Sequence, residues 1–240
     1  MKPVIVIPAR MAATRFPGKP LADIHGRPMI QYVIECAQAA NLGDVIVAAG
    51  DQVIVEAVKH LDCTAVLTDP NLPSGSDRIH AALEKIDPQQ TYTHVLNLQG
   101  DLPHLDPNLL NMLLDLLNSS DIDISTLCYE IQDKSELNDP SCVKIAMTER
   151  KENTFKALYF SRATIPHGDG PTYHHIGLYG YLRDSLNRFV KLPPSPLEKR
   201  EKLEQLRALE NGMKIGVKCV NSTPFGIDTK EDLEKLKSIM

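Results

Sequence analysis

The sequence lacks the paired spacings that would turn its cysteines into a structural site. Its five cysteines are scattered and include no C-x-x-C pair: Cys36, Cys63, Cys128, Cys142 and Cys219. A disulfide framework or a zinc site normally uses closely spaced cysteines. We therefore interpret these residues as reduced thiols of a cytoplasmic protein.

The sequence also lacks a long apolar run and an excess of positive charge. Pro8 and Arg10 break the N-terminal apolar stretch, which is too short for a signal peptide, and no run reaches membrane-spanning length. The 26 Lys and Arg residues against 31 Asp and Glu give a net charge of −5, whereas broad nucleic-acid binding needs a basic face. We expect neither a membrane nor a nucleic acid as partner.

The segment 4–21 joins a short apolar run to a loop rich in cations. Val4–Ile7 has the β-branched composition of a strand, and the prolines that follow prevent a strand or helix from continuing. The loop contains Arg10, Arg15 and Lys19. Cations beyond the carboxyl end of a strand are typical of an anion site in an α/β sheet, and the expected anion is a polyphosphate. A solvated basic loop is the alternative.

Two common phosphate-binding motifs are absent from this loop. Gly18-Lys19 resembles the end of a P-loop, but Pro20 stands where Ser or Thr would hold the metal. Position 13 is alanine where the motif needs its earlier glycine. No G-x-G-x-x-G follows the first strand, which argues against a dinucleotide-binding dehydrogenase.

Strand-like and helix-like segments alternate through the first half of the chain. The pattern predicts strands at 4–7, 45–49, 64–67 and 94–98, and helices at 29–40, 52–60, 77–86 and 106–117. Ser76 is the expected N-cap of the third helix. This rhythm predicts an α/β fold with a mostly parallel sheet and helices on both faces.

After about residue 121 the pattern changes to consecutive strands. We expect strands at 122–129, 143–148, 154–160, 175–182 and 214–220, the second and third forming an antiparallel hairpin. One continuous helix is predicted at 198–210, with Gly212 just beyond it, and a closing helix at 230–239. The simplest organisation is a single domain over 1–240 with an added hairpin region at about 122–165.

Two carboxylates stand where ligands bind in open α/β sheets. Asp101 follows the fourth predicted strand, and Asp228 precedes the closing helix. A triphosphate is normally handled with Mg²⁺, which prefers one or two carboxylates together with phosphate oxygens and water. Each residue is also a plausible turn residue, and Asp228 alternatively caps the closing helix.

Eight sequence blocks, spread over nearly the whole chain, carry a family resemblance. They are IPARMAATRFPGKPL (7–21), GSDR (75–78), NLQGD (97–101), FSRATIP (160–166), HIGLYGY (175–181), PSPLE (194–198), LEQLRALENG (203–212) and GIDTKEDLE (226–234). In this order they resemble the 3-deoxy-manno-octulosonate cytidylyltransferases, also called CMP-Kdo synthetases. The resemblance implies a Rossmann-like, GT-A-like nucleotidyltransferase fold, a homodimer, and transfer of CMP from CTP to the anomeric 2-hydroxyl of Kdo.

The resemblance also implies which residues form the site. The CTP-binding positions are Pro8, Ala9, Arg10, Arg15, Lys19, Gly75, Ser76, Arg78 and Gln99. Asp101 and Asp228 would hold Mg²⁺ and act in catalysis together with Arg10, Arg15 and Lys19. The sugar-binding positions are Gln99, Arg162, His175, Tyr179, Glu204 and Gln205. Among these, the guanidinium of Arg162 suits the sugar carboxylate, because its fork can pair with both oxygens. Without the resemblance, His175 and Tyr179 would be read as ordinary strand residues.

Three positions depart from the usual pattern of the family. Leu102 follows Asp101 where a glutamate is usual, Ala13 replaces a frequent serine, and Phe225 replaces a threonine before Gly226. None of these removes a principal charge, so we expect an active enzyme. Two alternatives stay open: a cytidylyltransferase for another keto-sugar acid, such as 8-amino-Kdo or a sialic acid, and a nucleotide-binding module that has lost catalysis.

Overall fold

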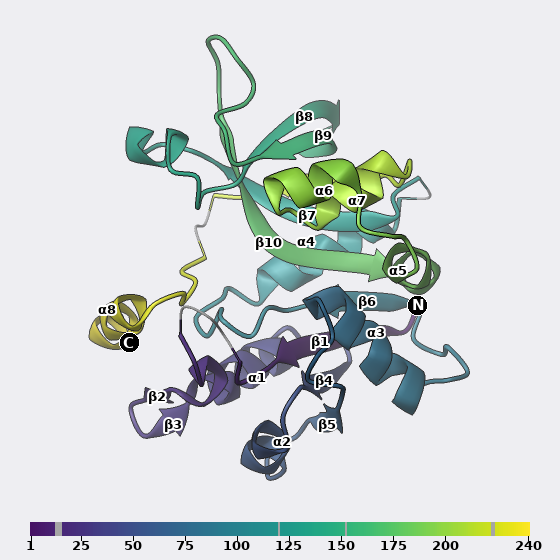
Figure 1. Cartoon of the computed structure of the whole chain (residues 1–240), viewed down its shortest axis with the longest axis vertical. Coiled ribbons are helices and arrows are strands. Elements are labelled where there is room, and N and C mark those ends of the chain that lie inside the picture. Colours follow the sequence, from purple (N-terminus) through teal and green to yellow (C-terminus); the bar gives the residue numbers. More distant parts are fainter. Residues whose placement is uncertain (13–15, 120, 152, 222–223) are drawn as a thin grey trace. The chain divides into compact units, whose positions relative to one another are not determined.

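Two structural units share the chain (Figure 1). The N-terminal unit consists of residues 1–111 and 224–240, and the C-terminal unit of residues 112–223. The structure is a computed structural model that describes residues 1–12, 16–119, 121–151, 153–221 and 224–240.

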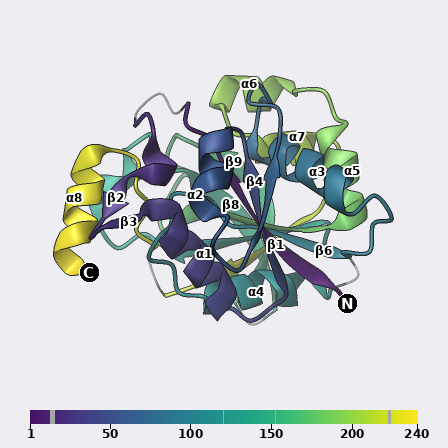
Figure 2. The ribbon, with the colours of Figure 1, turned by 90° about the horizontal axis from the view of Figure 1, so that it is seen from below.

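A parallel sheet forms the centre of the N-terminal unit, with strand order β5–β4–β1–β6. Its strands are β1 (Pro3–Ala9), β4 (Asp44–Ala49), β5 (Thr64–Leu67) and β6 (His94–Asn97). The side chains of residues 4–7 in β1 are fully buried, because a central parallel strand is covered on both faces. Helices α1 (Met29–Ala39) and α3 (Gly75–Ile86) lie on opposite sides of this sheet (Figure 2). The predicted parallel sheet is confirmed for this unit.

Helix α3 begins earlier than the sequence pattern predicted. Its N-cap is Ser74, whose Oγ accepts a hydrogen bond from the Asp77 backbone N–H at 3.1 Å and donates to Asp77 Oδ2 at 2.7 Å. Ser76 therefore lies inside the first turn and is buried, and its prediction as the N-cap is wrong. The carboxylate at the third helical position favours Ser74, because it completes a reciprocal pair with that hydroxyl.

A buried apolar cluster joins the loop after β1 to the last helix, α8 (Lys230–Ile239). Helix α2 (Gln52–Val58), the 3₁₀ turn η1 (Lys19–Leu21) and the short pair β2 (Asp23–Ile24) and β3 (Arg27–Pro28) complete this unit. The cluster comprises Phe16, Ile24, Met29, Tyr32, Ile227, Leu233 and Leu236. It brings residues 227–229 next to the loop that carries Lys19, although about 200 residues separate them in the sequence.

The C-terminal unit has a largely antiparallel sheet with strand order β10–β7–β11–β9–β8. Its strands are β7 (Ile124–Glu130), β8 (Lys144–Lys151), β9 (Thr154–Ser161), β10 (Tyr173–Leu182) and β11 (Ile215–Cys219). The β7–β11 pair is parallel, and the other pairs are antiparallel. The fold as a whole is therefore α/β with mixed strand directions. The expectation of a mostly parallel sheet fails here, because short turns such as that between β8 and β9 can join only antiparallel neighbours.

The predicted hairpin is confirmed as β8 and β9, but the predicted helix at 198–210 is wrong. Two helices replace it, α6 (Pro196–Glu201) and α7 (Gln205–Glu210), and Lys202 between them has a positive φ of 57°. A capping box of Ser195 and Glu198 starts α6. Gly212 has a φ of 72° just beyond the C-cap of α7, where glycine is favoured. The remaining helical segments are α4 (Asn108–Leu117), η2 (Lys134–Leu137) and α5 (Arg183–Val190).

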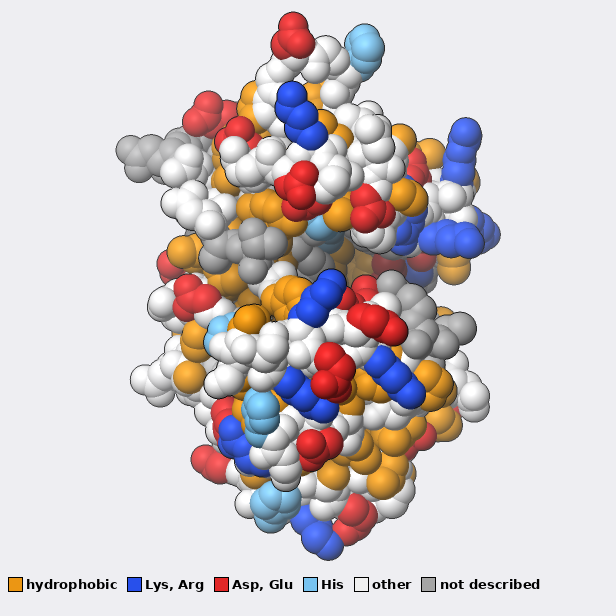
Figure 3. All heavy atoms as spheres, turned by 90° about the vertical axis from the view of Figure 1, so that its left-hand side faces the viewer, with side chains coloured by type: hydrophobic (Ala, Val, Ile, Leu, Met, Phe, Trp, Pro, Cys, Tyr) orange, Lys and Arg blue, Asp and Glu red, His pale blue; other side chains and the backbone are white. Residues whose placement is uncertain are grey.

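Two further features of the structure are the length of its helices and the charge pattern on its surface. Within the described parts of the chain, no helix is both long and apolar enough to cross a membrane. On the face drawn in Figure 3, acidic and basic side chains are interspersed over the surface.

The apolar cluster predicts the effect of a truncation in α8. Leu236 is fully buried, whereas Ile239 on the same helix is 66% exposed. We expect Leu236→Ala to lower the free energy of unfolding by about 2–5 kcal/mol, because it removes buried methyl groups and leaves a cavity. Ile239→Ala is the matched control and should change it by less than about 0.5 kcal/mol. Urea unfolding of both variants measures this, and equal effects would contradict the packing described.

Candidate active site

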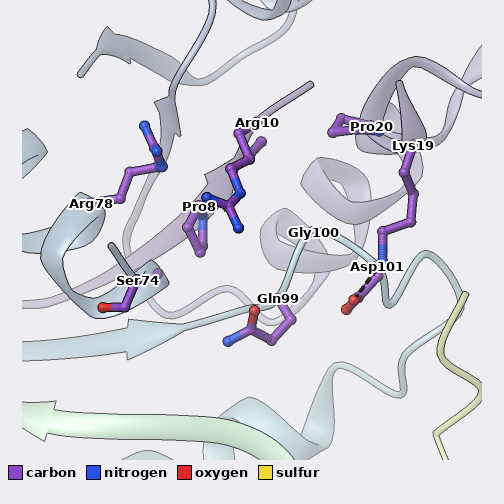
Figure 4. A pocket seen from close by; sticks show the side chains of 11 residues that line it. Pro8, Arg10, Lys19, Pro20, Ser74, Arg78, Gln99, Gly100 and Asp101 are labelled. Atoms are coloured by element: carbon purple, nitrogen blue, oxygen red, sulfur yellow. Dashed lines mark hydrogen bonds and ion pairs between the residues drawn. The ribbon is translucent and has the colours of Figure 1, made fainter. Parts of the chain in front are cut away.

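A cavity of about 260 Å³ opens at the carboxyl ends of β1 and β6 in the N-terminal unit (Figure 4). Its lining residues come from three loops and from the start of α3: Pro8, Ala9, Arg10, Lys19, Pro20, Ser74, Gly75, Arg78, Gln99, Gly100 and Asp101. Most of the predicted CTP-binding residues therefore meet in one place. The buried Ser76 is not among the lining residues, and Arg15 lies outside the described residues.

Backbone hydrogen bonds fix the loop that carries the cations. The Gly50 N–H donates to Ala9 O at 2.8 Å, and the Met11 N–H donates to Asp51 Oδ2 at 2.7 Å. At the other end of the loop, the Gly18 N–H donates to Met11 O at 2.9 Å. Arg10 and Lys19 consequently reach the cavity from two sides (Figure 4).

The Lys19 ammonium stands between the two predicted metal ligands. Its Nζ lies 2.9 Å from Asp101 Oδ2 and 3.7 Å from Asp228 Oδ1, and it also donates to Ile227 O at 2.8 Å. The side chain of Lys19 is only 16% exposed, against 33% for Asp101 and 47% for Asp228. The Ile227 N–H in turn donates to Asp101 O at 2.9 Å. The two carboxylates thus converge on one cation-binding position.

Asp228 does not cap the last helix, so the alternative interpretation of this residue as a helix cap is wrong. Thr229 is the N-cap of α8, and its Oγ1 accepts from the Asp232 N–H at 3.2 Å. Asp232 Oδ2 accepts from the backbone N–H groups of Thr229 and Asp228 at 2.9 and 3.1 Å. Burial opposes the charged form of Asp232, yet hydrogen bonds from Thr229 and Asp228 lower its pKa. The carboxylate of Asp228 is therefore left to face Lys19.

Arg78 forms the floor of the cavity and is 2% exposed. Its Nη1 donates to Thr68 Oγ1 at 2.6 Å and to Asp69 O at 3.0 Å, which ties α3 to the loop after β5. Burial and the nearby charge of Arg10 lower the pKa of Arg78. A Cβ added at Gly50 would lie 2.7 Å from Arg78 Nη1 and 3.2 Å from Arg10 Cβ. Only glycine at position 50 leaves room for both guanidinium side chains.

His175 and Tyr179, two predicted sugar-binding residues, flank an irregularity in β10. The pairing of β10 with β7 shifts between Ile176 and Tyr179, and such bulges re-aim side chains beside functional sites. His175 Nε2 lies 2.9 Å from Thr126 Oγ1, and that hydroxyl also contacts the main-chain oxygens at 176 and 178. Burial, with a smaller contribution from His174, lowers the pKa of His175 to about 3, so its ring is neutral at pH 7.

Arg162 binds main-chain carbonyl groups within the C-terminal unit. Its Nε donates to Glu201 O at 2.9 Å, its Nη1 to Pro140 O at 2.8 Å and its Nη2 to Lys202 O at 3.5 Å. The Glu201 carboxylate accepts from the Arg162 N–H at 3.0 Å and from Ser161 Oγ at 2.9 Å. Arg162 therefore has a structural role that the sequence did not indicate. Counting only contacts with described residues, three of its five N–H donors are occupied, which leaves two for a ligand.

Glu204 and Gln205 lie at the start of α7. Glu204 is the N-cap residue and Gln205 is the first helical residue. Burial, Tyr181 and the charge of Glu204 together raise the pKa of Tyr179. Gln205 is buried.

Sequence reasoning missed several residues of these sites. Ser74, Pro20 and Gly100 line the cavity, and Thr126 and Glu201 position the predicted sugar-binding residues. The Ser74-x-x-Asp77 spacing is a capping signal that could have identified Ser74. No local signal marks Thr126 or Glu201, because their partners are distant in the sequence.

Comparison with known proteins shows the family of this chain. The model of the family described as Cytidylyltransferase matches residues 4–215. The chain is 54% identical to the 3-deoxy-manno-octulosonate cytidylyltransferase of Parvibaculum lavamentivorans, over 99% of this chain and 92% of that protein. It is 53% identical to the enzyme of the same name from Rhodospirillum rubrum, over 99% and 95% of the two chains. A solved CMP:2-keto-3-deoxy-manno-octonic acid synthetase in complex with CTP is 38% identical, with a TM-score of 0.92 over 100% of this chain and 98% of that one.

The fold and the family match define an enzyme of the nucleotidyltransferase class. Within that class, the chain belongs to the family of 3-deoxy-manno-octulosonate cytidylyltransferases. The resemblance carried by the eight sequence blocks is confirmed.

The crowding at Gly50 predicts a selective defect in nucleotide binding. We expect Gly50→Ala to displace Arg78 or Arg10 by a few tenths of an ångström or more, and to weaken CTP binding about ten-fold to a hundred-fold. Gly177→Ala is the matched control, since a Cβ there meets no atom within 4 Å. Isothermal titration with CTP measures both. Unchanged CTP affinity in Gly50→Ala would contradict this account of the cavity floor.

Burial of His175 predicts a pH-dependent stability. Below its ordinary value of 6.5 and above about 3, the unfolded chain binds a proton at this ring and the folded chain does not. The free energy of unfolding therefore falls as pH decreases through this window, by up to about 1.4 kcal/mol per pH unit. We expect His175→Gln to lose less stability than wild type between pH 7 and pH 5 in urea titrations. A variant of the exposed His60, His60→Gln, should behave like wild type.

Proposed function

We propose that the cavity of the N-terminal unit binds CTP and that the enzyme transfers CMP to the anomeric 2-hydroxyl of Kdo, with release of pyrophosphate. The observation that carries the proposal is the convergence of Arg10, Lys19 and Asp101 on one cavity, with Asp228 Oδ1 3.7 Å from the Lys19 ammonium. Kdo is a lipopolysaccharide sugar acid, so the product is an activated precursor for lipopolysaccharide synthesis.

The cations suit the departure of pyrophosphate. Negative charge develops on the leaving phosphates during in-line displacement at the α-phosphorus, and fixed cations stabilise that charge. Arg10 and Lys19 are held in place by the backbone bonds of their loop, and Arg15 belongs to the same segment. No side-chain nucleophile is required, because the sugar hydroxyl attacks directly.

The two carboxylates fit a divalent metal, which we propose to be Mg²⁺. Asp101 and Asp228 already share one cation, the Lys19 ammonium, and two carboxylates with phosphate oxygens are a donor set that Mg²⁺ prefers. When bound, the metal would supply Lewis-acid chemistry that favours deprotonation of the attacking hydroxyl. Lys19 would then exchange its carboxylate partners for phosphate oxygens.

We propose sugar-binding roles for Gln99 of the N-terminal unit and for several residues of the C-terminal unit. The neutral ring of His175 and the phenol of Tyr179 offer hydrogen bonds to sugar hydroxyls, and the charge of Glu204 contributes to the raised pKa of that phenol. Gln205 belongs to the same set. Three N–H donors of Arg162 bind main-chain carbonyl groups. Arg162 would therefore bind the sugar carboxylate through its other two N–H donors.

Further proposals concern the fold type and the assembly. We propose that the whole chain acts as one Rossmann-like, GT-A-like nucleotidyltransferase domain.

We also propose that the chain forms a homodimer through the hairpin region at about 122–165. Leu158 of β9 supports the homodimer, because it is a large apolar side chain that is 55% exposed. Sedimentation velocity of wild type and Leu158→Asp tests it: a dimer that Leu158→Asp weakens is expected, and a wild-type monomer would contradict it.

The acidic pair predicts two inactive variants. We expect Asp101→Asn and Asp228→Asn each to lower kcat by about a hundred-fold to a thousand-fold, because charge at the metal position is lost. The control is Glu231→Gln, which alters an exposed carboxylate three residues from Asp228 and should retain wild-type turnover. A coupled assay of pyrophosphate release with CTP, Kdo and Mg²⁺ measures all three. Wild-type rates in either aspartate variant would refute the metal assignment.

The same assay separates the acceptors. Crossing several nucleotides with Kdo, 8-amino-Kdo and a sialic acid should give turnover with CTP and Kdo. Faster turnover of another acid would assign that acid as the substrate. Binding of CTP with no turnover of any acid would indicate an inactive module.

A further inference from the structure

Three potential metal ligands, none of them assigned above, converge in the C-terminal unit. They are Glu136 in η2, Cys142 in the loop before β8 and His174 in β10. His174 Nδ1 lies 2.8 Å from Glu136 Oε2, and one ligand atom from each residue lies within 4.8 Å of the others. Among the residues that the structure describes, these three form such a cluster of nitrogen, sulfur and oxygen donors.

The sheet holds this cluster in a defined frame. His174 pairs with Tyr129 of β7 on one side and with Lys144 of β8 on the other. The Lys144 side chain is fully buried, and its ammonium donates to Cys142 O at 2.8 Å and to Asp139 O at 2.7 Å. The backbone of Cys142 is therefore fixed relative to His174. A set of ligands held on strands and anchored loops needs little rearrangement to bind an ion.

Tyr129 provides an outer partner for the cluster. Its hydroxyl donates to Glu136 Oε2 at 2.8 Å and lies 2.5 Å from His174 Nδ1, a contact that an ion bound at Nδ1 would replace. Its ring lies 4.9 Å from the His174 ring. Hydrogen-bonded neighbours of this kind orient metal ligands and tune their affinity. The side chains of His174 and Glu136 are 21% and 27% exposed, so a small ion can reach them from solvent.

We propose that Glu136, Cys142 and His174 form a site for a borderline-soft divalent cation of the Zn²⁺ type. A thiolate, an imidazole and a carboxylate are the donors that Zn²⁺ takes in tetrahedral sites, with bonds of about 2.0–2.3 Å. Mg²⁺ prefers oxygen ligands, so this site differs in kind from the Asp101–Asp228 pair. The ion would replace the hydrogen that His174 and Glu136 share, and these two atoms would separate by about 0.5 Å to reach tetrahedral spacing.

Binding would tie three separate segments together. The ion would link η2 and the loop at 138–142 to the start of β10, with release of the Cys142 thiol proton to solvent. The stability of the C-terminal unit would then depend on the metal. This role is independent of CMP transfer.

Titration with Co²⁺, a spectroscopic substitute for Zn²⁺, tests the proposal on the full chain. The protein is first stripped with a chelator, and excess Mg²⁺ is then added to occupy oxygen-only sites. We expect one equivalent of Co²⁺ to give visible bands of a tetrahedral ion and a near-ultraviolet thiolate-to-cobalt band, both displaced by Zn²⁺. Zn²⁺ should also raise the unfolding temperature, since it binds the folded chain.

Variants decide which residues bind. Cys142→Ser should abolish the thiolate band, and His174→Gln and Glu136→Gln should each weaken Co²⁺ binding by about a hundred-fold or more. Cys63→Ser is the control, because Cys63 is also a half-buried free thiol but lies in the N-terminal unit. Circular dichroism checks that each variant is folded. Absence of the thiolate band in wild type, or its persistence in Cys142→Ser, would overturn the proposal.

Discussion

The contact between the Lys19 ammonium and two aspartates organises the N-terminal unit. Like charges repel, so a cation between Asp101 and Asp228 stabilises their approach to one another. Lys19 supplies that cation at 2.9 and 3.7 Å, and its side chain is mostly buried, where charge interactions are stronger than in water. Under the proposed function, the same position would accept a metal ion when a triphosphate offers Lys19 new partners.

The C-terminal unit buries several polar groups and keeps them hydrogen-bonded. The Thr126 hydroxyl lies within hydrogen-bond distance of His175 Nε2 and of two main-chain oxygens at the bulge in β10. The Glu201 carboxylate accepts hydrogen bonds from the Ser161 hydroxyl and from the Arg162 backbone N–H. An unsatisfied buried group would destabilise the unit by about 1–3 kcal/mol. These contacts therefore hold His175 and Arg162, the proposed sugar-binding residues, in place.

Sequence patterns predicted the parts of this protein that local physics determines. The buried strand at 4–7, the alternation with helices and the hairpin of β8 and β9 follow from side-chain periodicity. The break at Lys202 could not be predicted, since tertiary contacts of Glu201 override a run of good helix formers. The motifs identified Asp228, but its approach to Lys19 depends on an apolar cluster between distant segments. Pairings over such separations leave no trace in local composition.

The dependence of the acidic pair on α8 has a consequence for biosynthesis. A ribosome releases the chain from the N-terminus onwards, so β1, the Lys19 loop and Asp101 can fold long before Asp228 is made. Until the apolar residues of α8 emerge, the nascent chain has Lys19 and Asp101 but lacks Asp228, the second carboxylate of their contact. The contact of Lys19 with both aspartates is thus completed late in translation.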